Sequence, residues 1–119
     1  MKCIEIERQV TDSHLAINMK SGSLEVLATP QMIAWMEEAS CLCLDLEEGM
    51  TSVGTMMNVS HEKASPKGAI IRICAKILQE EGRKVVFEVQ AFQGDVCIGR
   101  GKHERFIVNA KRFLEKTYA

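Results

Sequence analysis

The stretch LATPQMIAWMEEASCLCLDLEEG, residues 27–49, decides how this chain folds. Thr29-Pro30 predicts a helix start, with Thr29 as the N-cap and Pro30 in the first helical position. The helical pattern continues to about Glu48. Gly49 is well placed to end it, because glycine readily adopts the left-handed conformation of a helix C-terminus. The sequence therefore predicts one long helix in the first half of the chain.

Only one narrow stripe of this helix is polar. Gln31, Glu38 and Asp45 recur every seven residues and, at about 100° per residue, share one direction. Nearly all other positions are apolar or small, so we expect the helix to be buried around most of its girth. A flat sheet on one side cannot cover such a helix. The sheet must therefore curl around it, or a second subunit must complete its cover.

Segments with the periodicity of strands lie on both sides of the helix in the sequence. Apolar and charged positions alternate in residues 3–12, and glycine-containing turns separate the later segments. The later strands are expected at 51–64, 69–80, 83–93 and 96–108, followed by a short helix at 109–117. Their short links predict an antiparallel meander. We therefore predict one α+β domain over residues 1–119, a hot-dog fold in which a curved antiparallel sheet of about five strands wraps one long central helix.

Composition and charge narrow the classes of function. The 119 residues are 46% hydrophobic and 26% charged, as in ordinary globular proteins, and the net charge is −1. We expect no nucleic-acid partner, because phosphate contacts normally require a basic surplus. The N-terminal segment carries Glu5, Glu7 and Arg8 where a signal peptide needs an apolar run. No stretch approaches the roughly 18 apolar residues of a membrane span, so we expect a cytoplasmic protein with no membrane partner.

The cysteines do not form a metal-binding pattern. There are five, an odd number, and no CxxC pair occurs. Cys41 and Cys43 lie two positions apart in the helical pattern, so their side chains point in different directions. Small buried hydrophobic residues in a reducing cytosol explain these cysteines better than metal ligation. We predict no metal site.

Glu37 is the carboxylate of the helix that points away from the polar stripe. It lies about 100° from Glu38, and its neighbours one turn away include Ile33 and Cys41. A carboxylate in that setting loses hydration unless partners compensate, and proteins retain such groups for pairing or for chemistry. From periodicity alone, a rim glutamate that reaches solvent and an acid–base residue both stay open.

Two further polar residues are candidates for the same site. His61 lies in the strand segment 51–64 on one face with two valines and a methionine, and neither face of that segment is cleanly polar. We therefore expect this strand to be covered on both sides. A lone histidine in such a place is more often structural, but facing Glu37 it would form an acid–base unit. Thr29 lies two helical turns before Glu37, so its hydroxyl can open into the same cleft.

Three segments together resemble the thioesterase family that includes fluoroacetyl-CoA thioesterase. They are LATPQMIAWMEEAS (27–40), SVGTMMNVSHEKASPKG (52–68) and GRGKHERFIV (99–108), in the family's order and spacing over nearly the whole chain. The resemblance implies a hot-dog fold, a homodimer with sites at the subunit interface, and hydrolysis of small acyl-CoA thioesters to free acid and CoA. It also implies a catalytic set, which falls here on Thr29, Glu37 and His61. These are the residues that the pattern had already indicated.

The chain departs from the family at the acyl pocket. Ser21-Gly22-Ser23-Leu24 lies where the fluoroacetyl-specific enzyme carries aromatic residues over that pocket. We therefore do not predict selectivity for a fluorinated acyl group.

The implied chemistry assigns roles to these residues as a hypothesis. Glu37 activates a water as general base or attacks the thioester directly, His61 polarises the carbonyl or protonates the departing thiolate, and Thr29 orients Glu37 or the water. The backbone N–H of Gly54 or Thr55 is the candidate oxyanion donor. Further candidates for contact with substrate are Met36 and Met57 for the acyl group, and, for the CoA phosphates, Lys63, Lys67, Arg72, Arg100, Lys102 and Arg105. The reaction requires no cofactor, since CoA is part of the substrate.

Two other functions stay open. A non-catalytic acyl-CoA binding or sensing module would share the fold, although it has no need of a buried base. A hot-dog enoyl-CoA hydratase would place an Asp and a His within a few residues near the helix start, and the segment ATPQMIAWMEE contains neither. Turnover of a panel of thioesters separates a hydrolase from a binding module.

Overall fold

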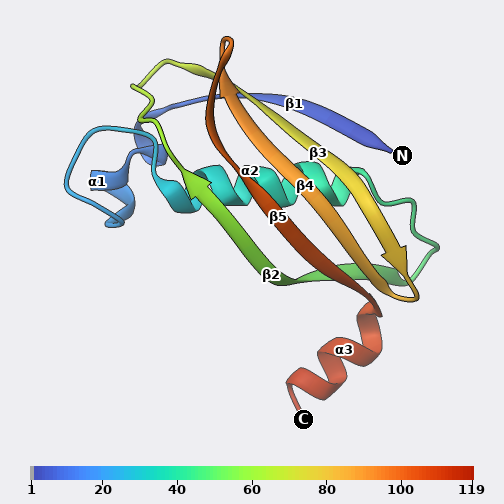
Figure 1. Ribbon diagram of the computed structural model, residues 1–119. Helices are drawn as coiled ribbons and strands as arrows, with labels where there is room; N and C mark the ends of the chain where they lie inside the picture. The colour runs from blue at the N-terminus through green and yellow to red at the C-terminus, as the bar shows by residue number, and fades with distance from the viewer. Residues whose placement is uncertain (1) are drawn as a thin grey trace.

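Helix α2, Thr29–Leu42, lies across one face of a five-stranded antiparallel sheet that curls around it (Figure 1). The computed structural model describes residues 2–119. Its strands are β1 (Cys3–Gln9), β2 (Met50–His61), β3 (Ile70–Glu81), β4 (Lys84–Gln93) and β5 (Val96–Asn109). This arrangement confirms the predicted α+β hot-dog fold, and the four later strands begin and end within a few residues of the predicted bounds.

The strand order is β1-β3-β4-β5-β2, so the predicted simple meander is wrong for β2. Strands β3, β4 and β5 pair consecutively, but β2 pairs with β5, and His61 lies opposite Gly99. The segment 62–69 then crosses to the far side of the sheet, where the Gly68 N–H donates to the Val10 carbonyl. A turn-rich sequence between two strands therefore marks a crossover here and not a hairpin.

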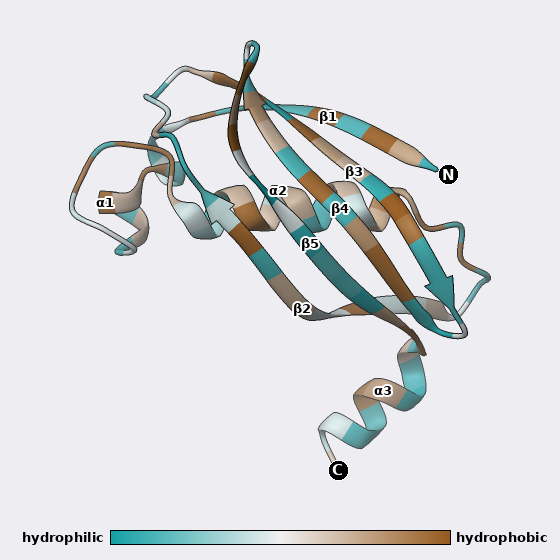
Figure 2. Cartoon of the chain, viewed as in Figure 1, coloured by the Kyte–Doolittle hydropathy of each residue, from teal (hydrophilic) through white to brown (hydrophobic). Residues whose placement is uncertain are grey.

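The core lies between α2 and the inner face of the sheet. Met32, Trp35, Met36 and Ala39 of α2 are buried against apolar side chains of β3 and β4, and Figure 2 shows apolar and polar bands alternating along these strands. Gly99 of β5 allows the helix a close approach, because a Cβ there would lie only 2.6 Å from the Met32 Sδ. This contact seats the N-terminal half of α2 against β5, beside the end of β2.

The start of α2 differs from the prediction by one residue, with a consequence for the site. Ala28 is the N-cap and has extended backbone (φ −71°, ψ 136°), whereas Thr29 is already the first helical residue and Pro30 the second. The predicted N-cap role of Thr29 is therefore wrong. Because the Thr29 hydroxyl is not bonded to the backbone of its own helix, it is free to bond a side chain from another element.

The end of α2 comes earlier than predicted, at Leu42 and not near Glu48. Cys43 is the C-cap, and its buried thiol donates to the Ala75 carbonyl of β3. Leu44, which extended the predicted helical pattern beyond this point, instead packs against the core in a non-helical connection. Gly49, with φ +84°, belongs to the turn into β2.

The segment between β1 and α2 contains two short helices that the sequence pattern did not indicate. They are a 3-10 helix at Asp12–His14 and α1 at Ala16–Met19. The strand predicted for residues 3–12 ends earlier, at Gln9, because the 3-10 helix begins at Asp12. At its N-cap, the backbone N–H of Thr11 donates to Nδ1 of His14.

The C-terminal helix α3, Ala110–Thr117, confirms the short helix expected at 109–117 and points away from the sheet (Figure 1). The Asn109 side chain caps it by accepting a hydrogen bond from the Arg112 N–H. None of the helices within residues 2–119 has the length and hydrophobicity needed to cross a bilayer.

Strand β2 forms one edge of the sheet and is the least covered long strand. All twelve of its residues are half-buried or exposed, including Val53, Met57 and Val59. The expectation that this strand is covered on both sides therefore does not hold within a single chain. An edge of this length presents unpaired backbone groups that another strand can bond.

Candidate active site

The first cluster of candidate residues joins the start of α2 to the end of β2. The Thr29 Oγ1 lies 2.7 Å from the His61 Nδ1, within hydrogen-bond distance. Thr29 reaches this position because it is the first residue of α2, and His61 because it closes β2 opposite Gly99, which leaves room for the helix. The structure thus brings together two of the three residues predicted to be catalytic.

His61 has one ring nitrogen engaged and the other unpaired. Its Nε2 is buried and has no hydrogen-bond partner within residues 2–119. Burial lowers the pKa of His61 below its usual value, so the ring is neutral near pH 7. If Nδ1 accepts the Thr29 hydroxyl hydrogen, the ring proton lies on Nε2. An unpaired, buried N–H is suited to donate to a bound carbonyl or thiolate.

A small cleft opens beside this pair. It has a volume of about 220 Å³ and is lined by Thr29 and His61 together with residues of the connections around them, among them Ala16, Ser21 and Lys63. The α1 segment therefore forms one wall of the cleft. A cleft of this size, with the His61 ring in its lining, can hold a short acyl group.

The second cluster lies about two turns further along α2, around Glu37. The Glu37 side chain is 43% exposed, and its Oε2 lies 3.6 Å from the Arg105 Nη1 in an ion pair. Gly54 provides the space for this carboxylate, because a Cβ at Gly54 would lie 3.0 Å from the Glu37 Oε2. Glu37 is therefore half-buried, as expected, but its charged partner comes from β5 and is not His61.

Arg105 is buried and held by hydrogen bonds from several sides. Its Nε–H donates to the Ser52 Oγ at 2.8 Å, its Nη2 to the Ser52 carbonyl at 3.0 Å, and its Nη1 to the His103 Nε2 at 3.2 Å. Only 7% of the residue is exposed. From the sequence, Arg105 was only a possible phosphate ligand, and neither Ser52 nor His103 was identified. The spacing along β5 puts His103 and Arg105 on the same face as Gly99, but it does not show which face of the strand points inward.

The two clusters do not touch within one chain. Thr29 and Glu37 lie about 12 Å apart along the helix axis, at 1.5 Å per residue. Among the residues that the structure describes, no hydrogen bond or ion pair joins Glu37 to His61. The acid–base contact considered from sequence is therefore not made within a single protomer.

The neighbouring helix residue, Glu38, behaves as the polar stripe predicts. It pairs with Arg8 of β1 at the surface, and both side chains are substantially exposed. The contrast between adjacent glutamates confirms that they face different surroundings. Glu37 turns toward the sheet and a buried guanidinium, whereas Glu38 turns toward an exposed strand edge.

The remaining candidates for substrate contact occupy different environments. Thr55 is the extra residue of a β-bulge, since Gly54 pairs with Arg105 and Met56 with Glu104, and its hydroxyl donates to the Glu104 carbonyl. Met57 is half-buried on β2. Met36 is fully buried in the core. Contact of these residues with an acyl group stays a prediction.

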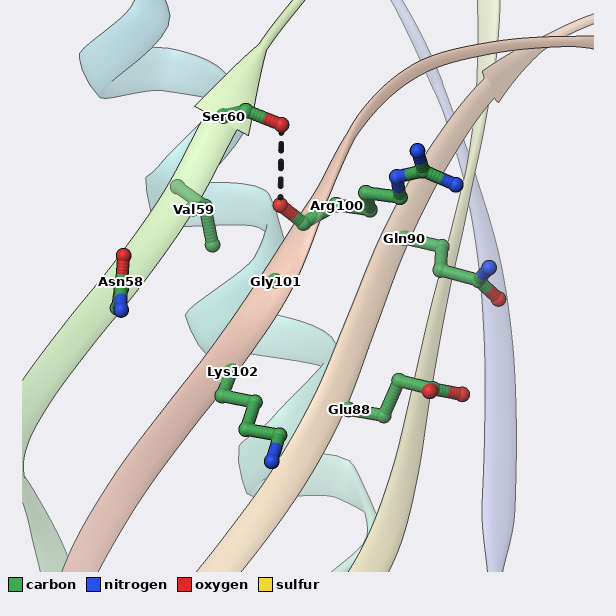
Figure 3. A pocket seen from close by; sticks show the side chains of 8 residues that line it. All are labelled: Asn58, Val59, Ser60, Glu88, Gln90, Arg100, Gly101 and Lys102. Atoms are coloured by element: carbon green, nitrogen blue, oxygen red, sulfur yellow. Dashed lines mark hydrogen bonds between the residues drawn. The ribbon is translucent and has the colours of Figure 1, made fainter.

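A larger groove lies on the opposite face of the sheet. It has a volume of about 510 Å³, and Figure 3 shows side chains of β2, β4 and β5 around it, with α2 behind the sheet. Its polar lining consists of Asn58, Ser60, Glu88, Gln90, Arg100 and Lys102. Neither Glu37 nor His61 lines it, so we place the candidate chemistry on the helix side.

Titratable side chains in residues 2–119 do not gather into groups of three or more that could hold a metal ion. The five cysteines are free thiols, of which Cys43 is buried. Burial raises the pKa of Cys43 and of Cys74, which makes both thiols poor nucleophiles at neutral pH. Neither of these two thiols lines the cleft beside Thr29 and His61.

Comparison with known proteins gives a consistent result. A family model described as fluoroacetyl-CoA-specific thioesterase matches residues 10–111. The chain is 36% identical over 95 residues to a fluoroacetyl-CoA thioesterase from Streptantibioticus cattleyicolor, and the match covers 78% of this chain and 68% of that enzyme.

Solved structures show the same likeness. A structure of a fluoroacetyl-CoA thioesterase superposes with a TM-score of 0.94 at 28% identity, covering 98% of this chain and 93% of that one. A mutant of a fluoroacetyl-CoA-specific thioesterase, in complex with fluoroacetate and CoA, superposes with a TM-score of 0.91 at 29% identity, covering 96% and 95% of the two chains. The similarity thus extends over the helix and the sheet.

Proposed function

This chain belongs to the fluoroacetyl-CoA-specific thioesterase family, and we propose that it hydrolyses small acyl-CoA thioesters to the free acid and CoA with Thr29, Glu37 and His61. The observation that carries the assignment of residues is the Thr29–His61 hydrogen bond, which joins the start of α2 to the end of β2 and leaves the His61 Nε2 unpaired. The carboxylate of Glu37, which lies where a side chain at Gly54 would otherwise be, supplies the base or nucleophile.

Glu37 can act in hydrolysis by either of two routes. In the first, Glu37 takes a proton from water while the water oxygen attacks the thioester carbonyl carbon, the C–S bond breaks, and the CoA thiolate takes up a proton. In the second, a Glu37 oxygen attacks the carbonyl and displaces the thiolate, and water then opens the mixed anhydride and restores the carboxylate. Both routes consume one water and release the acid and CoA.

His61 and the bulge in β2 would stabilise the charge that develops on the carbonyl oxygen. Because burial keeps the ring of His61 neutral, its Nε2–H can donate to that oxygen or to the departing thiolate. The bulge at Thr55 interrupts the ladder between β2 and β5, and a bulge leaves backbone groups unpaired. This supports the backbone N–H of Gly54 or Thr55 as a second donor.

We propose a short acyl group as the substrate. The cleft beside Thr29 and His61 measures about 220 Å³, which suits a few carbon atoms and the adjoining thioester better than a long chain. Lys63 lies in the lining of this cleft, where an ammonium group can meet a phosphate of CoA. Because a carboxylate, an imidazole and water suffice for thioester hydrolysis, we propose that no metal or redox cofactor takes part.

We further propose a homodimer that completes the site. Two β2 edges paired antiparallel about a two-fold axis near Met57 would bring the His61 end of one copy toward the Gly54 end of the other. Glu37 of one subunit would then meet the Thr29–His61 pair of its partner. The open β2 edge, with its half-buried Val59, supports this arrangement, and it explains why the two clusters stay apart in one chain.

Complementation tests the shared site directly. Glu37→Gln and His61→Ala are each expected to inactivate the homodimer, but a mixed dimer retains one site with both native residues. Equimolar mixing with subunit exchange should restore roughly a quarter of the wild-type activity, since half of the dimers are mixed and each has one intact site. Sedimentation should show a dimer. Failure to regain activity despite subunit exchange would place each site within one chain.

A panel of thioesters tests the function itself. Acetyl-, propionyl- and longer acyl-CoA substrates are incubated with the protein, and thiol release is followed with a chromogenic disulfide. The proposal expects many turnovers per protein, with short acyl groups preferred. Acyl-CoA binding by calorimetry without thiol release would favour the non-catalytic module instead. We also propose a cytoplasmic location, which accords with five free cysteines in a reducing compartment.

A further inference from the structure

We propose that Arg105 is a positioning residue that aims the Glu37 carboxylate, and that His103 and Ser52 hold the Arg105 guanidinium in the orientation this requires. The inference rests on the proposed hydrolase function, and it adds residues that act through Glu37 and not on the substrate. Its basis is a chain of contacts running from the backbone of β2, through Arg105 of β5, to the Glu37 carboxylate.

The guanidinium has little freedom to move. Three of its nitrogens are bonded within 3.2 Å, two to Ser52 and one to His103. Because the guanidinium is planar and bonded on several sides, the N–H of Nη1 that faces Glu37 has a fixed direction. The ammonium of a lysine, on a flexible chain, would not have one. The Nη1 that reaches His103 is also the atom 3.6 Å from the Glu37 Oε2. The direction of this nitrogen therefore determines where the carboxylate lies.

His103 can fill this role only in one tautomer. Its Nδ1 lies 2.8 Å from the Met56 carbonyl, which can only accept, so Nδ1 carries the proton. The Nε2 of the neutral ring is then an acceptor, as a bond from Arg105 requires. The ring also stacks on Phe87, with 5.9 Å between centroids, and only 1% of the residue is exposed. Burial lowers the pKa of His103, which is consistent with a neutral acceptor.

Gly54 of β2 lies directly against the Glu37–Arg105–His103 contacts. A Cβ at this position would approach the Glu37 Oε2, the His103 Cε1 and the Arg105 Nη1, all within 3.4 Å. One glycine thus leaves the space in which three polar groups meet. The fit suits a carboxylate that must keep one orientation through the reaction, since a misplacement of about 1 Å can cost about 100-fold in rate.

The first test replaces the guanidinium. Arg105→Met keeps much of the buried volume and removes the fork, and Arg105→Lys keeps the charge but cannot make all the bonds. We expect kcat for the best short acyl-CoA to fall by about 100-fold in Arg105→Met, with KM changed by less than about threefold. Arg105→Lys should recover only part of this loss. Arg8→Met, which removes the exposed partner of Glu38, is the matched control and should keep the wild-type kcat.

The second test uses two conservative variants of His103. In His103→Gln the amide oxygen can reach the position of Nε2 and accept from Arg105. In His103→Asn the shorter amide can still donate to the Met56 carbonyl but does not reach Arg105. We expect kcat to be about tenfold higher in the Gln variant than in the Asn variant, because only the former keeps the acceptor. Thermal melting of each variant shows that it is folded.

The outcomes separate this inference from the proposed function. If the wild-type protein releases no thiol, the hydrolase function fails, and if Glu37→Gln retains full activity, the assignment of Glu37 fails. If Glu37→Gln is inactive but folded Arg105→Met keeps the wild-type kcat, or raises KM alone, Arg105 does not position Glu37. Should Arg105→Met fail to fold, the His103 pair decides: equal kcat in the Gln and Asn variants overturns the proposal.

Discussion

The two halves of α2 carry two different kinds of polar cluster. Near its N-terminus, Thr29 bonds a neutral histidine beside a small cleft, and one ring nitrogen stays unpaired. In its middle, Glu37 pairs with a buried guanidinium, each nitrogen of which is hydrogen-bonded to Ser52 or His103. The first cluster thus has an imidazole nitrogen without a hydrogen-bond partner, whereas the second has a carboxylate paired with a fixed guanidinium.

This difference shows how the chemistry is divided. Hydrolysis of a thioester requires a base or nucleophile on one side of the carbonyl and a donor on the other. Each cluster supplies one of these, and the two lie about 12 Å apart along the helix of one chain. The dimer proposed above joins complementary halves from two subunits. Variants that alter one cluster at a time therefore test this division.

The largest expected effect follows from Glu37→Gln. This change keeps the shape of the side chain and removes the base or nucleophile, so kcat for acetyl- or propionyl-CoA should fall by about 1,000-fold or more. Glu38→Gln is the matched control, and because its pair with Arg8 is exposed we expect activity within about twofold of wild type. Thiol release measures both. Equal losses at the two positions would mean that the charged cluster has no special role.

A smaller loss is expected at the neutral cluster. His61→Ala removes the unpaired ring nitrogen, and kcat should fall by about 100-fold. His61→Asn offers a sharper comparison, because its amide can still bond the Thr29 hydroxyl but has no atom at the position of Nε2. If Nε2 carries the chemistry, the Asn and Ala variants are equally impaired. Near wild-type activity of His61→Asn would show that the bond to Thr29 is what matters.

Much of the fold could be predicted because its signals are local. Strand periodicity and glycine turns placed β3, β4 and β5 correctly, and the apolar girth of residues 27–49 indicated that the sheet must curl. The errors arose where tertiary contacts override local pattern. Cys43 ends α2 by bonding β3, and the segment 62–69 crosses the molecule instead of turning back.

The site was predictable only in part, for a related reason. Glu37 and His61 were conspicuous because each is polar in an apolar pattern. Ser52, His103 and Arg105 were not, since polar and apolar residues do not alternate cleanly around them and the inward face of their strands cannot be assigned without the register. The pairing of β2 with β5 determines that register, and the crossover that creates this pairing has no local signal.

A third prediction tests whether Thr29 acts through its hydroxyl. Thr29→Val keeps the branched shape in the first turn of α2 but loses the hydrogen bond to His61. We expect kcat to fall by roughly tenfold, equivalent to about 1.4 kcal/mol of transition-state stabilisation. Thr29→Ser retains the hydroxyl and should stay within about threefold of wild type. If the Val and Ser variants have the same activity, the hydroxyl does not orient the ring.

The smallest expected effect is on the pH dependence of stability. It involves one histidine from each cluster. Burial lowers the pKa of both His61 and His103, whereas an unfolded histidine titrates near about 6.5. As pH falls below that value, the unfolded chain binds protons that the folded chain does not, so stability is lost with acidification. We expect the melting temperature to fall by about a few degrees between pH 7.5 and pH 5.5, a window above the titration range of most carboxylates.

His103→Gln removes one of these two buried rings, and its melting temperature should therefore depend less on pH across the same window. Thermal melts at matched ionic strength measure this, and ring-proton NMR titration reports each histidine directly. A ring that titrates above about 6.5 in the folded protein would reverse the sign, because stability would then rise on acidification. Such a result at His61 alone would mean that a negatively charged group faces its ring.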